Sequence, residues 1–220
     1  MSTTRKRLIV YDLDGTLADT AEDIAEAVNA MLKRLMVSPM SQEEIRRLVG
    51  RGLHDLIGRC LKTSDPDRIR SGLDAFEAYY AAHLVDHSAL YPGVPEVLDY
   101  FHDRRQAVLT NKPSPFARDL LAALGVAQRF CAILAGTDGQ PKKPDPTALR
   151  ALMQTQAVSA SETLLVGDSV IDVQTGRNAG VLTVIVAQGF EDPQALGAAH
   201  PDLLVTHFAQ LLQVAKQQGW

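Results

Sequence analysis

The stretch that decides the fold reads Leu8-Ile9-Val10-Tyr11-Asp12-Leu13-Asp14-Gly15-Thr16. Its apolar, partly β-branched beginning predicts a short buried strand. Two carboxylates, Asp12 and Asp14, follow at the end of that strand, directly before a glycine turn. In open α/β sheets, ligands bind outside the carboxyl ends of the strands. The stretch therefore predicts a ligand site at the end of the first strand.

Asp12 and Asp14 would bring two negative charges close together. Burying like charges costs free energy unless a cation or a proton compensates them. The pair therefore indicates a metal ion and a division of roles, in which Asp12 is an ionised nucleophile and Asp14 can carry a proton. The alternative is an ordinary Asp/Gly turn between a strand and a helix.

The composition is that of an ordinary globular protein. The chain has 220 residues, 46% hydrophobic and 22% charged, enough for one core and a small second module. Its net charge of −4 argues against nucleic-acid or anionic-membrane partners. No apolar run is long enough to span a membrane or resembles a signal peptide, and Cys60 and Cys131 match no metal or redox spacing. We expect a cytoplasmic monomer or homodimer.

The segment from about residue 18 to about residue 86 predicts helices and no strand. Apolar residues recur at helical spacing after Thr20, which together with Asp23 predicts a capping box. A second capping box is expected at Ser41 with Glu44.

Strands alternate with helices in the rest of the chain, which predicts a parallel, doubly wound sheet. The fold class is therefore α/β, with a core formed by residues 1–17 and 87–220 and a helical insert of residues 18–86 after the first strand. Further strands are expected at residues 107–109, 131–134, 163–166, 181–186 and 203–205. Helices are expected at residues 94–104, 115–124, 146–156, 170–179 and 208–216.

Polar residues follow two more of the predicted strands. Thr110 and Asn111 come directly after residues 107–109, where a hydroxyl and an amide can hold phosphate oxygens as an oxyanion hole does. Lys143 precedes a helix; its charge can lie between Asp12 and a substrate phosphate, keep Asp12 ionised and reduce the repulsion between two anions. Either stretch alone is equally compatible with a solvated loop.

Asp168 and Asp172 follow the most apolar strand of the chain. They are one helical turn apart and face the same way. Magnesium prefers oxygen ligands, often one or two carboxylates with water and substrate phosphate. Asp12, the backbone carbonyl of Asp14 and Asp168 can supply them, with Asp172 either as a ligand or as a support for the ligands. The alternative is an aspartate that caps a helix with an acidic first turn.

Together these stretches resemble the four motifs of the haloacid dehalogenase-like phosphohydrolases in order and spacing: Asp12/Asp14, Thr110, Lys143 and Asp168/Asp172. The resemblance covers nearly the whole chain and places a helical cap at the insert. It is strongest to the phosphoglycolate phosphatase-like branch, which shares the Thr-Asn-Lys-Pro and Lys-Pro-x-Pro forms of residues 110–113 and 143–146. Lys143 is chosen over Lys142 because the family's lysine directly precedes the proline. Tyr11 stands where the family usually has phenylalanine.

The resemblance implies a magnesium-dependent phosphatase acting on a small phosphorylated substrate, with 2-phosphoglycolate as the first candidate. Asp12 would form an aspartyl-phosphate, Asp14 would act as general acid and base, and Thr110 and Lys143 would stabilise the phosphoryl group. In the insert, Arg51 lies between two glycines and could pair with a substrate carboxylate, although an exposed arginine is as often only solvated.

Two other functions fit the same residues. A phosphomutase similar to β-phosphoglucomutase would return the phosphoryl group to a second hydroxyl of the substrate. A phosphoaspartate signalling or binding protein would keep the aspartyl-phosphate, but its length and large helical insert count against it.

Overall fold

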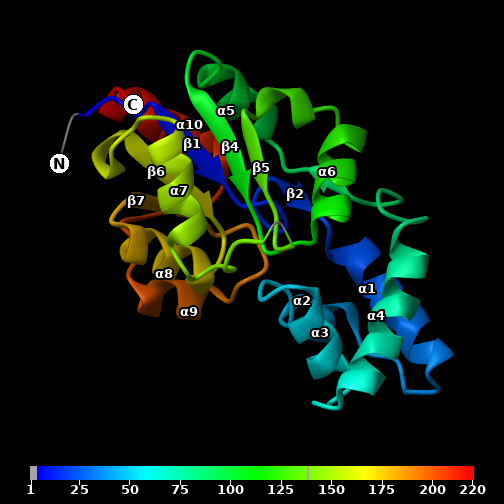
Figure 1. Ribbon diagram of the computed structural model, residues 1–220. Helices are drawn as coiled ribbons and strands as arrows, with labels where there is room; N and C mark the ends of the chain where they lie inside the picture. Colours follow the sequence, from blue (N-terminus) through cyan, green and yellow to red (C-terminus); the bar gives the residue numbers. More distant parts are fainter. Residues whose placement is uncertain (1–3, 138) are drawn as a thin grey trace.

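The computed structural model describes residues 4–137 and 139–220. Its centre is a six-stranded parallel sheet in the order β5-β4-β1-β6-β7-β8 (Figure 1). The strands are β1 (Leu8–Tyr11), β4 (Arg105–Leu109), β5 (Ala132–Leu134), β6 (Thr163–Gly167), β7 (Leu182–Val186) and β8 (Leu203–Val205). The predicted α/β class with a parallel, doubly wound sheet is confirmed.

Helices cover both faces of this sheet, because the crossovers between parallel strands return over its faces. Ile9 and Tyr11 of β1 point into one hydrophobic layer, and Leu8 and Val10 point into the other. The first layer includes α5 (Val94–Tyr100), α6 (Ser114–Ala123) and α10 (Phe208–Gln218). The second includes α7 (Thr147–Thr155), α8 (Val170–Ala179) and α9 (Pro193–Ala199). Two short 3-10 helices span Ala127–Arg129 and Ala160–Glu162.

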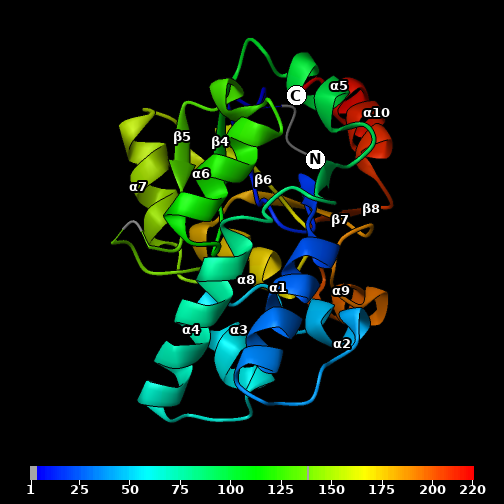
Figure 2. The ribbon, with the colours of Figure 1, turned by 90° about the vertical axis from the view of Figure 1, so that its right-hand side faces the viewer.

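The insert forms a separate helical lobe next to the carboxyl edge of the sheet (Figures 1 and 2). Its helices are α1 (Ala21–Arg34), α2 (Gln42–Arg46), α3 (Leu53–Cys60) and α4 (Pro66–Tyr80). Their apolar faces pack together around buried residues such as Met31, Ile57 and Phe76. We call this lobe the cap.

The expectation of helices alone from residue 18 onward is wrong at one place. Residues Ala18–Asp19 form strand β2, which pairs antiparallel with β3 (Ala89–Leu90), at the two points where the chain passes between core and cap. A two-residue strand is too short to produce an alternating pattern, so it could not be predicted from hydrophobic periodicity.

The predicted capping box at Thr20 is also wrong. The Thr20 side chain makes no capping bond; its hydroxyl donates to Asp14 Oδ1 at 2.8 Å. Asp23 accepts instead from the backbone N–H groups of His87 and Ser88, at 2.9 and 2.8 Å. The capping box at Ser41 with Glu44 is confirmed.

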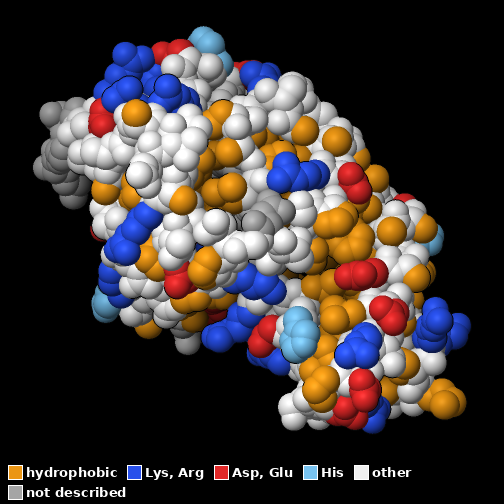
Figure 3. Space-filling view, in the orientation of Figure 1, with side chains coloured by type: hydrophobic (Ala, Val, Ile, Leu, Met, Phe, Trp, Pro, Cys, Tyr) orange, Lys and Arg blue, Asp and Glu red, His pale blue; other side chains and the backbone are white. Residues whose placement is uncertain are grey.

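The visible face of the molecule carries lysine, arginine, aspartate and glutamate side chains mixed with apolar ones (Figure 3). Within the described ranges, 4–137 and 139–220, none of the helices has the length and apolar character needed to cross a membrane.

Candidate active site

Three adjacent strands bring the predicted site residues to one edge of the sheet. Asp12 follows β1, Thr110 follows β4 and Asp168 follows β6, and β1 lies between the other two. The chain adds strands on the β4 side first and then continues from β6 on the other side, so this edge is the topological switch point where α/β sheets bind ligands.

Asp12 is buried and held by two donors. Its Oδ1 accepts from the backbone N–H of Leu13 at 2.7 Å, and its Oδ2 lies 2.8 Å from Lys143 Nζ. Burial raises the pKa of Asp12 to about 6, against the opposing effect of the Lys143 charge. Burial alone would lower the pKa of Lys143, but the charges of Asp12 and Asp172 outweigh it and leave the pKa raised. Lys143 therefore stays protonated and favours the ionised form of the Asp12 carboxylate.

Asp168 lies in a tight polar niche. Its Oδ1 accepts from the Thr16 hydroxyl and its Oδ2 from the backbone N–H of Phe190, both at 2.8 Å. Gly15 and Gly189 surround this carboxylate so closely that a Cβ at either position would overlap it. Burial and the neighbouring charges of Asp172 and Asp12 raise the pKa of Asp168. Glycine is therefore required at both positions if the Asp168 carboxylate is to lie close to the other two aspartates.

Asp172 is fully buried and uses both of its oxygens within the protein. Its Oδ1 accepts from Lys143 Nζ at 2.7 Å. Its Oδ2 accepts from the Ser169 hydroxyl at 2.6 Å and from the backbone N–H groups of Asp168 and Ser169 at 3.3 and 3.2 Å. Asp172 therefore holds Lys143 and the turn that carries Asp168 in fixed positions.

The carboxylates of Asp12, Asp168 and Asp172 fit a divalent metal ion. Each offers an oxygen, these oxygens lie within 4.8 Å of one another, and all three residues are buried. A cation would relieve the repulsion that raises the pKa of Asp12 and Asp168. An all-oxygen donor set suits hard cations such as magnesium, calcium or manganese. These aspartates form a candidate divalent metal site.

Asp14 has a partner that the sequence analysis did not assign to the site. Lys112 Nζ donates to Asp14 Oδ1 at 2.9 Å and to the Tyr80 hydroxyl, from α4 of the cap, at 2.8 Å. Lys112 is buried; burial alone would lower its pKa, but Asp14 and Tyr80 outweigh it and leave the pKa raised. The position of Lys112 next to Thr110-Asn111 was a signal for a role in the site. Tyr80 had no such signal, because it lies 32 residues before Lys112 in the chain and belongs to the cap.

Thr110 and Asn111 have different environments. The Thr110 hydroxyl oxygen accepts from the backbone N–H of Lys112 at 3.2 Å, which leaves its hydrogen to be donated. The Asn111 amide donates to the carbonyls of Gly50 and Lys143 at 2.9 and 3.0 Å and accepts from the Lys143 N–H at 2.9 Å. Asn111 thus joins the cap loop to the loop that carries Lys143, and its donors are already in use.

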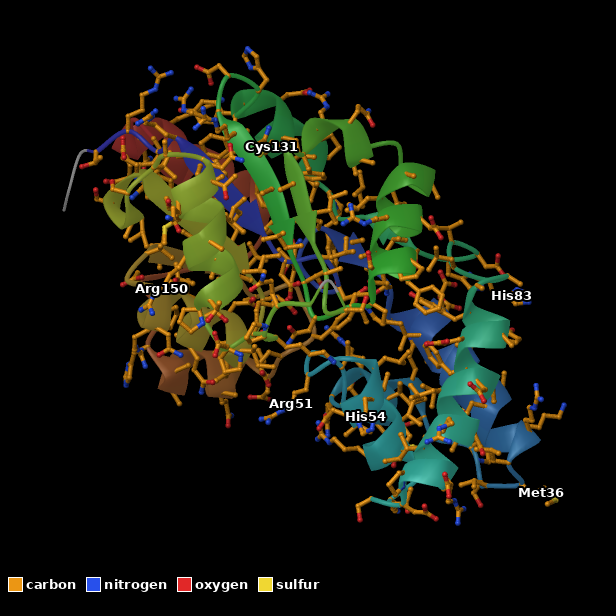
Figure 4. The ribbon with its side chains drawn as sticks, viewed as in Figure 1. Met36, Arg51, His54, His83, Cys131 and Arg150 are labelled. Carbon is orange, nitrogen blue, oxygen red and sulfur yellow. The ribbon has the colours of Figure 1, made fainter. Side chains whose placement is uncertain are left out.

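Arg51 is not brought to the aspartates. Its side chain is exposed (Figure 4) and borders a surface depression together with Arg47, Asp55 and Arg59. The neighbouring Arg46, which the sequence analysis missed, faces the site instead. It lines a hollow with Asp12, Asp14 and Asp168, donates to the carbonyl of Gly189, and lies 5.5 Å from the ring centroid of Phe190.

A parallel sheet with this switch-point site and a helical insert after its first strand defines a doubly wound α/β protein with a cap. The family model described as haloacid dehalogenase-like hydrolase matches residues 9–186. The chain belongs to this family, as the motif resemblance predicted.

Relatives match over almost the whole chain. A phosphoglycolate phosphatase of Vibrio parahaemolyticus is 36% identical, covering 94% of this chain and 95% of its own. One from Pseudomonas fluorescens is 35% identical, covering 94% of this chain and 78% of its own. The crystal structure of a predicted phosphoglycolate phosphatase from Haemophilus somnus superposes with a TM-score of 0.91 at 28% identity, covering 98% and 99% of the two chains. The chain is therefore a phosphoglycolate phosphatase-like hydrolase in sequence and in fold.

Proposed function

We propose that this enzyme hydrolyses small phosphate monoesters with the help of magnesium, and that 2-phosphoglycolate is its substrate. The observation that carries the proposal is the environment of the buried Asp12. Its Oδ2 lies 2.8 Å from Lys143 Nζ, and an oxygen of the Asp168 carboxylate lies within 4.8 Å of an Asp12 oxygen. In this arrangement Asp12 would be an ionised nucleophile beside two other groups. The Lys143 ammonium can bind a phosphate oxygen directly, and the Asp168 carboxylate can hold a metal ion that binds phosphate. The names of the relatives support the choice of substrate.

In the proposed reaction, an Asp12 oxygen forms a bond to phosphorus while the bond from phosphorus to the ester oxygen breaks. Asp14 gives its proton to the departing alkoxide, so an alcohol leaves. Asp14 then takes a proton from a water molecule whose oxygen bonds to phosphorus. The bond between phosphorus and the Asp12 oxygen breaks, which releases phosphate and restores the Asp12 carboxylate. General acid–base help of this kind contributes about 10²–10⁴-fold, and the covalent intermediate divides one difficult step into two.

The remaining residues stabilise the negative charge of the phosphoryl group during its transfer. Lys143 and the Thr110 hydroxyl bind phosphate oxygens, and Asp172 orients Lys143 through the contact at 2.7 Å. Asp12, the Asp14 carbonyl and Asp168 would hold magnesium, supported by Asp172. When bound, the ion supplies charge neutralisation at the phosphoryl oxygens. The cap excludes water while the ester bond breaks.

The test measures phosphate release from a panel of small monoesters, including 2-phosphoglycolate, in the presence of magnesium and of EDTA. Asp12→Asn is compared with Asp119→Asn, which changes an exposed aspartate of α6. We expect magnesium-dependent release that is abolished only by Asp12→Asn and is fastest with 2-phosphoglycolate. Release that survives Asp12→Asn or ignores EDTA contradicts the mechanism.

The same assay separates the alternatives. A phosphomutase would convert a hexose 1-phosphate to the 6-phosphate with little free phosphate. A signalling or binding protein would accumulate a stable phosphoprotein. Either result, in place of steady phosphate release, replaces the proposal.

A further inference from the structure

The space between cap and core has an unusual distribution of charge. Asp12 and Asp14 lie on its core side, and Lys112 is the one cationic side chain among the described residues that line it. The cap and α6 contribute mainly apolar side chains: Ile24, Val49, Leu53, Leu56, Phe76 and Phe116. An anionic group entering this space loses water and needs a cation to compensate. Lys112 is the residue placed to provide it.

Lys112 is held in position from both lobes. Asp14 Oδ1 and the Tyr80 hydroxyl accept from its ammonium at 2.9 and 2.8 Å, and Nζ also lies 4.8 Å from the Tyr80 ring centroid. An ammonium has three donor hydrogens. The two hydrogen bonds use two of them and leave one for a further acceptor.

The position of Lys112 relative to Asp14 defines what this acceptor is. Asp14 protonates the ester oxygen in the proposed reaction, so the ester oxygen lies against the Asp14 carboxyl group. In 2-phosphoglycolate, a single carbon atom separates the ester oxygen from the carboxylate. The carboxylate must then lie close to Asp14, and Lys112 is in direct contact with Asp14.

The cap arginines are placed less well for this role. Arg51 is exposed and lines a different depression. Arg46 lines a hollow that contains Asp12, Asp14 and Asp168, but its guanidinium is engaged by the Gly189 carbonyl and the Phe190 ring. Lys112, in contrast, donates directly to Asp14 at 2.9 Å.

We propose that Lys112, positioned by the Tyr80 hydroxyl of the cap, binds the carboxylate of the substrate and so selects phosphate esters of 2-hydroxy acids. This inference rests on the proposed phosphatase activity. It assigns specificity to a residue that immediately follows Thr110-Asn111, and it makes recognition of the carboxylate depend on the cap, because Tyr80 comes from α4.

The experiment compares two esters of the same length, 2-phosphoglycolate and 2-hydroxyethyl phosphate, in which a hydroxymethyl group replaces the carboxylate. The kcat/KM ratio of the two substrates is measured for the wild type, Lys112→Met, Arg51→Met and Arg46→Met. A charge-assisted hydrogen bond contributes enough that we expect Lys112→Met to lower the ratio about 10- to 100-fold. The two arginine variants should leave the ratio unchanged.

Three outcomes would overturn the inference. In the first, Lys112→Met lowers kcat/KM equally for both esters, which would mean that Lys112 acts only through Asp14. In the second, Arg51→Met or Arg46→Met changes the ratio of the two kcat/KM values and Lys112→Met does not. In the third, the wild type hydrolyses 2-hydroxyethyl phosphate as fast as 2-phosphoglycolate. In all three cases the phosphatase activity itself still stands, whereas a wild type that releases phosphate from neither ester removes the proposed function as well.

Tyr80→Phe keeps the test decisive if Lys112→Met does not fold. It removes the hydroxyl that positions Lys112 and leaves the aromatic ring in place. We expect the substrate ratio to fall about 3- to 10-fold, through a higher KM for 2-phosphoglycolate, less than for Lys112→Met because the ammonium that binds the carboxylate remains. An unchanged ratio with a correctly folded Tyr80→Phe contradicts the role of the cap in recognition.

Discussion

At the scale of single residues, the burial of Asp12 makes the stability of the fold depend on pH. Burial raises the pKa of Asp12 from its usual value of 3.8 to about 6. The folded chain therefore binds this proton more tightly than the unfolded chain does. The contribution of protonated Asp12 to the free energy of unfolding is fully present below about pH 4 and is lost as the pH rises through about 6. At neutral pH the ionised carboxylate destabilises the metal-free fold.

Asp12→Asn should therefore stabilise the metal-free protein while abolishing turnover. We expect its free energy of unfolding to exceed that of the wild type by about 1–3 kcal/mol near pH 7.5, and the difference to shrink toward about pH 5. Urea unfolding in EDTA at both pH values measures this. A wild type that is as stable as the variant at the higher pH would show that Lys143 compensates the charge completely.

At the scale of elements, the sequence predicted best where local signals agree. Helix α8 has its expected bounds, because Ser169 caps its beginning and Gly180, in the left-handed region, ends it. Helix α9 was missed, because Leu196 is its one large apolar side chain and so no helical periodicity exists. The capping role predicted for Thr20 was wrong because its hydroxyl donates to Asp14, and only the folded chain brings these two side chains together.

The same division applies to the site. The positions of Asp12, Asp14, Thr110, Lys143 and Asp168 could be read from the sequence, because each follows a strand or precedes a helix in a short motif; their roles in the reaction stay predictions. Lys112 with Tyr80, and Arg46 with Gly189, depend on contacts between cap and core. Such contacts leave no periodic trace in the chain. Lys112 did have a local signal, its position directly after Thr110-Asn111, but its partner Tyr80 did not.

Asp23 provides a test at this scale. It is fully buried in α1 and accepts from the N–H groups of His87 and Ser88 and from the Ser88 hydroxyl, the segment that returns from the cap. Asp23→Ala leaves these donors without a partner, which should cost roughly 2–4 kcal/mol of stability. Chemical unfolding measures the loss, and hydrogen exchange at residues 87–88 locates it.

The exposed neighbour Glu22 is the control, and Glu22→Ala should change stability by no more than about 0.5 kcal/mol. Equal effects of the two substitutions would mean that the loss comes from helix α1 as a whole and not from the bonds of Asp23.

At the scale of the whole molecule, polar contacts join cap and core around the site. Asn111 donates to the Gly50 carbonyl, Lys112 to Tyr80, and Arg46 to the Gly189 carbonyl. Each contact ends on a loop at the carboxyl edge of the sheet. We therefore expect any movement of the cap to change the arrangement of the site.

Arg46→Met tests this coupling without touching the aspartates. Losing its hydrogen bond and its contact with Phe190 should raise KM for every ester by about 2- to 30-fold, because the closed arrangement is less populated. Hydrogen exchange should increase in α2 and at residues 188–190. Arg47→Met is the control, since the adjacent Arg47 is 71% exposed and pairs only with Glu43 among its described partners. Identical kinetics for the two variants would exclude a role of Arg46 in closure.

The narrow β2–β3 ribbon has a consequence for how such a chain can change over evolutionary time. The polypeptide leaves the core at Ala18–Asp19 and returns at Ala89–Leu90, and these residues pair directly with one another. Everything between them is, in topological terms, one long hairpin loop. A genetic exchange at these two points would replace the cap as a cassette and join the new segment to ends already held side by side. Substrate choice can thus diversify between lineages while the catalytic chemistry is inherited unchanged.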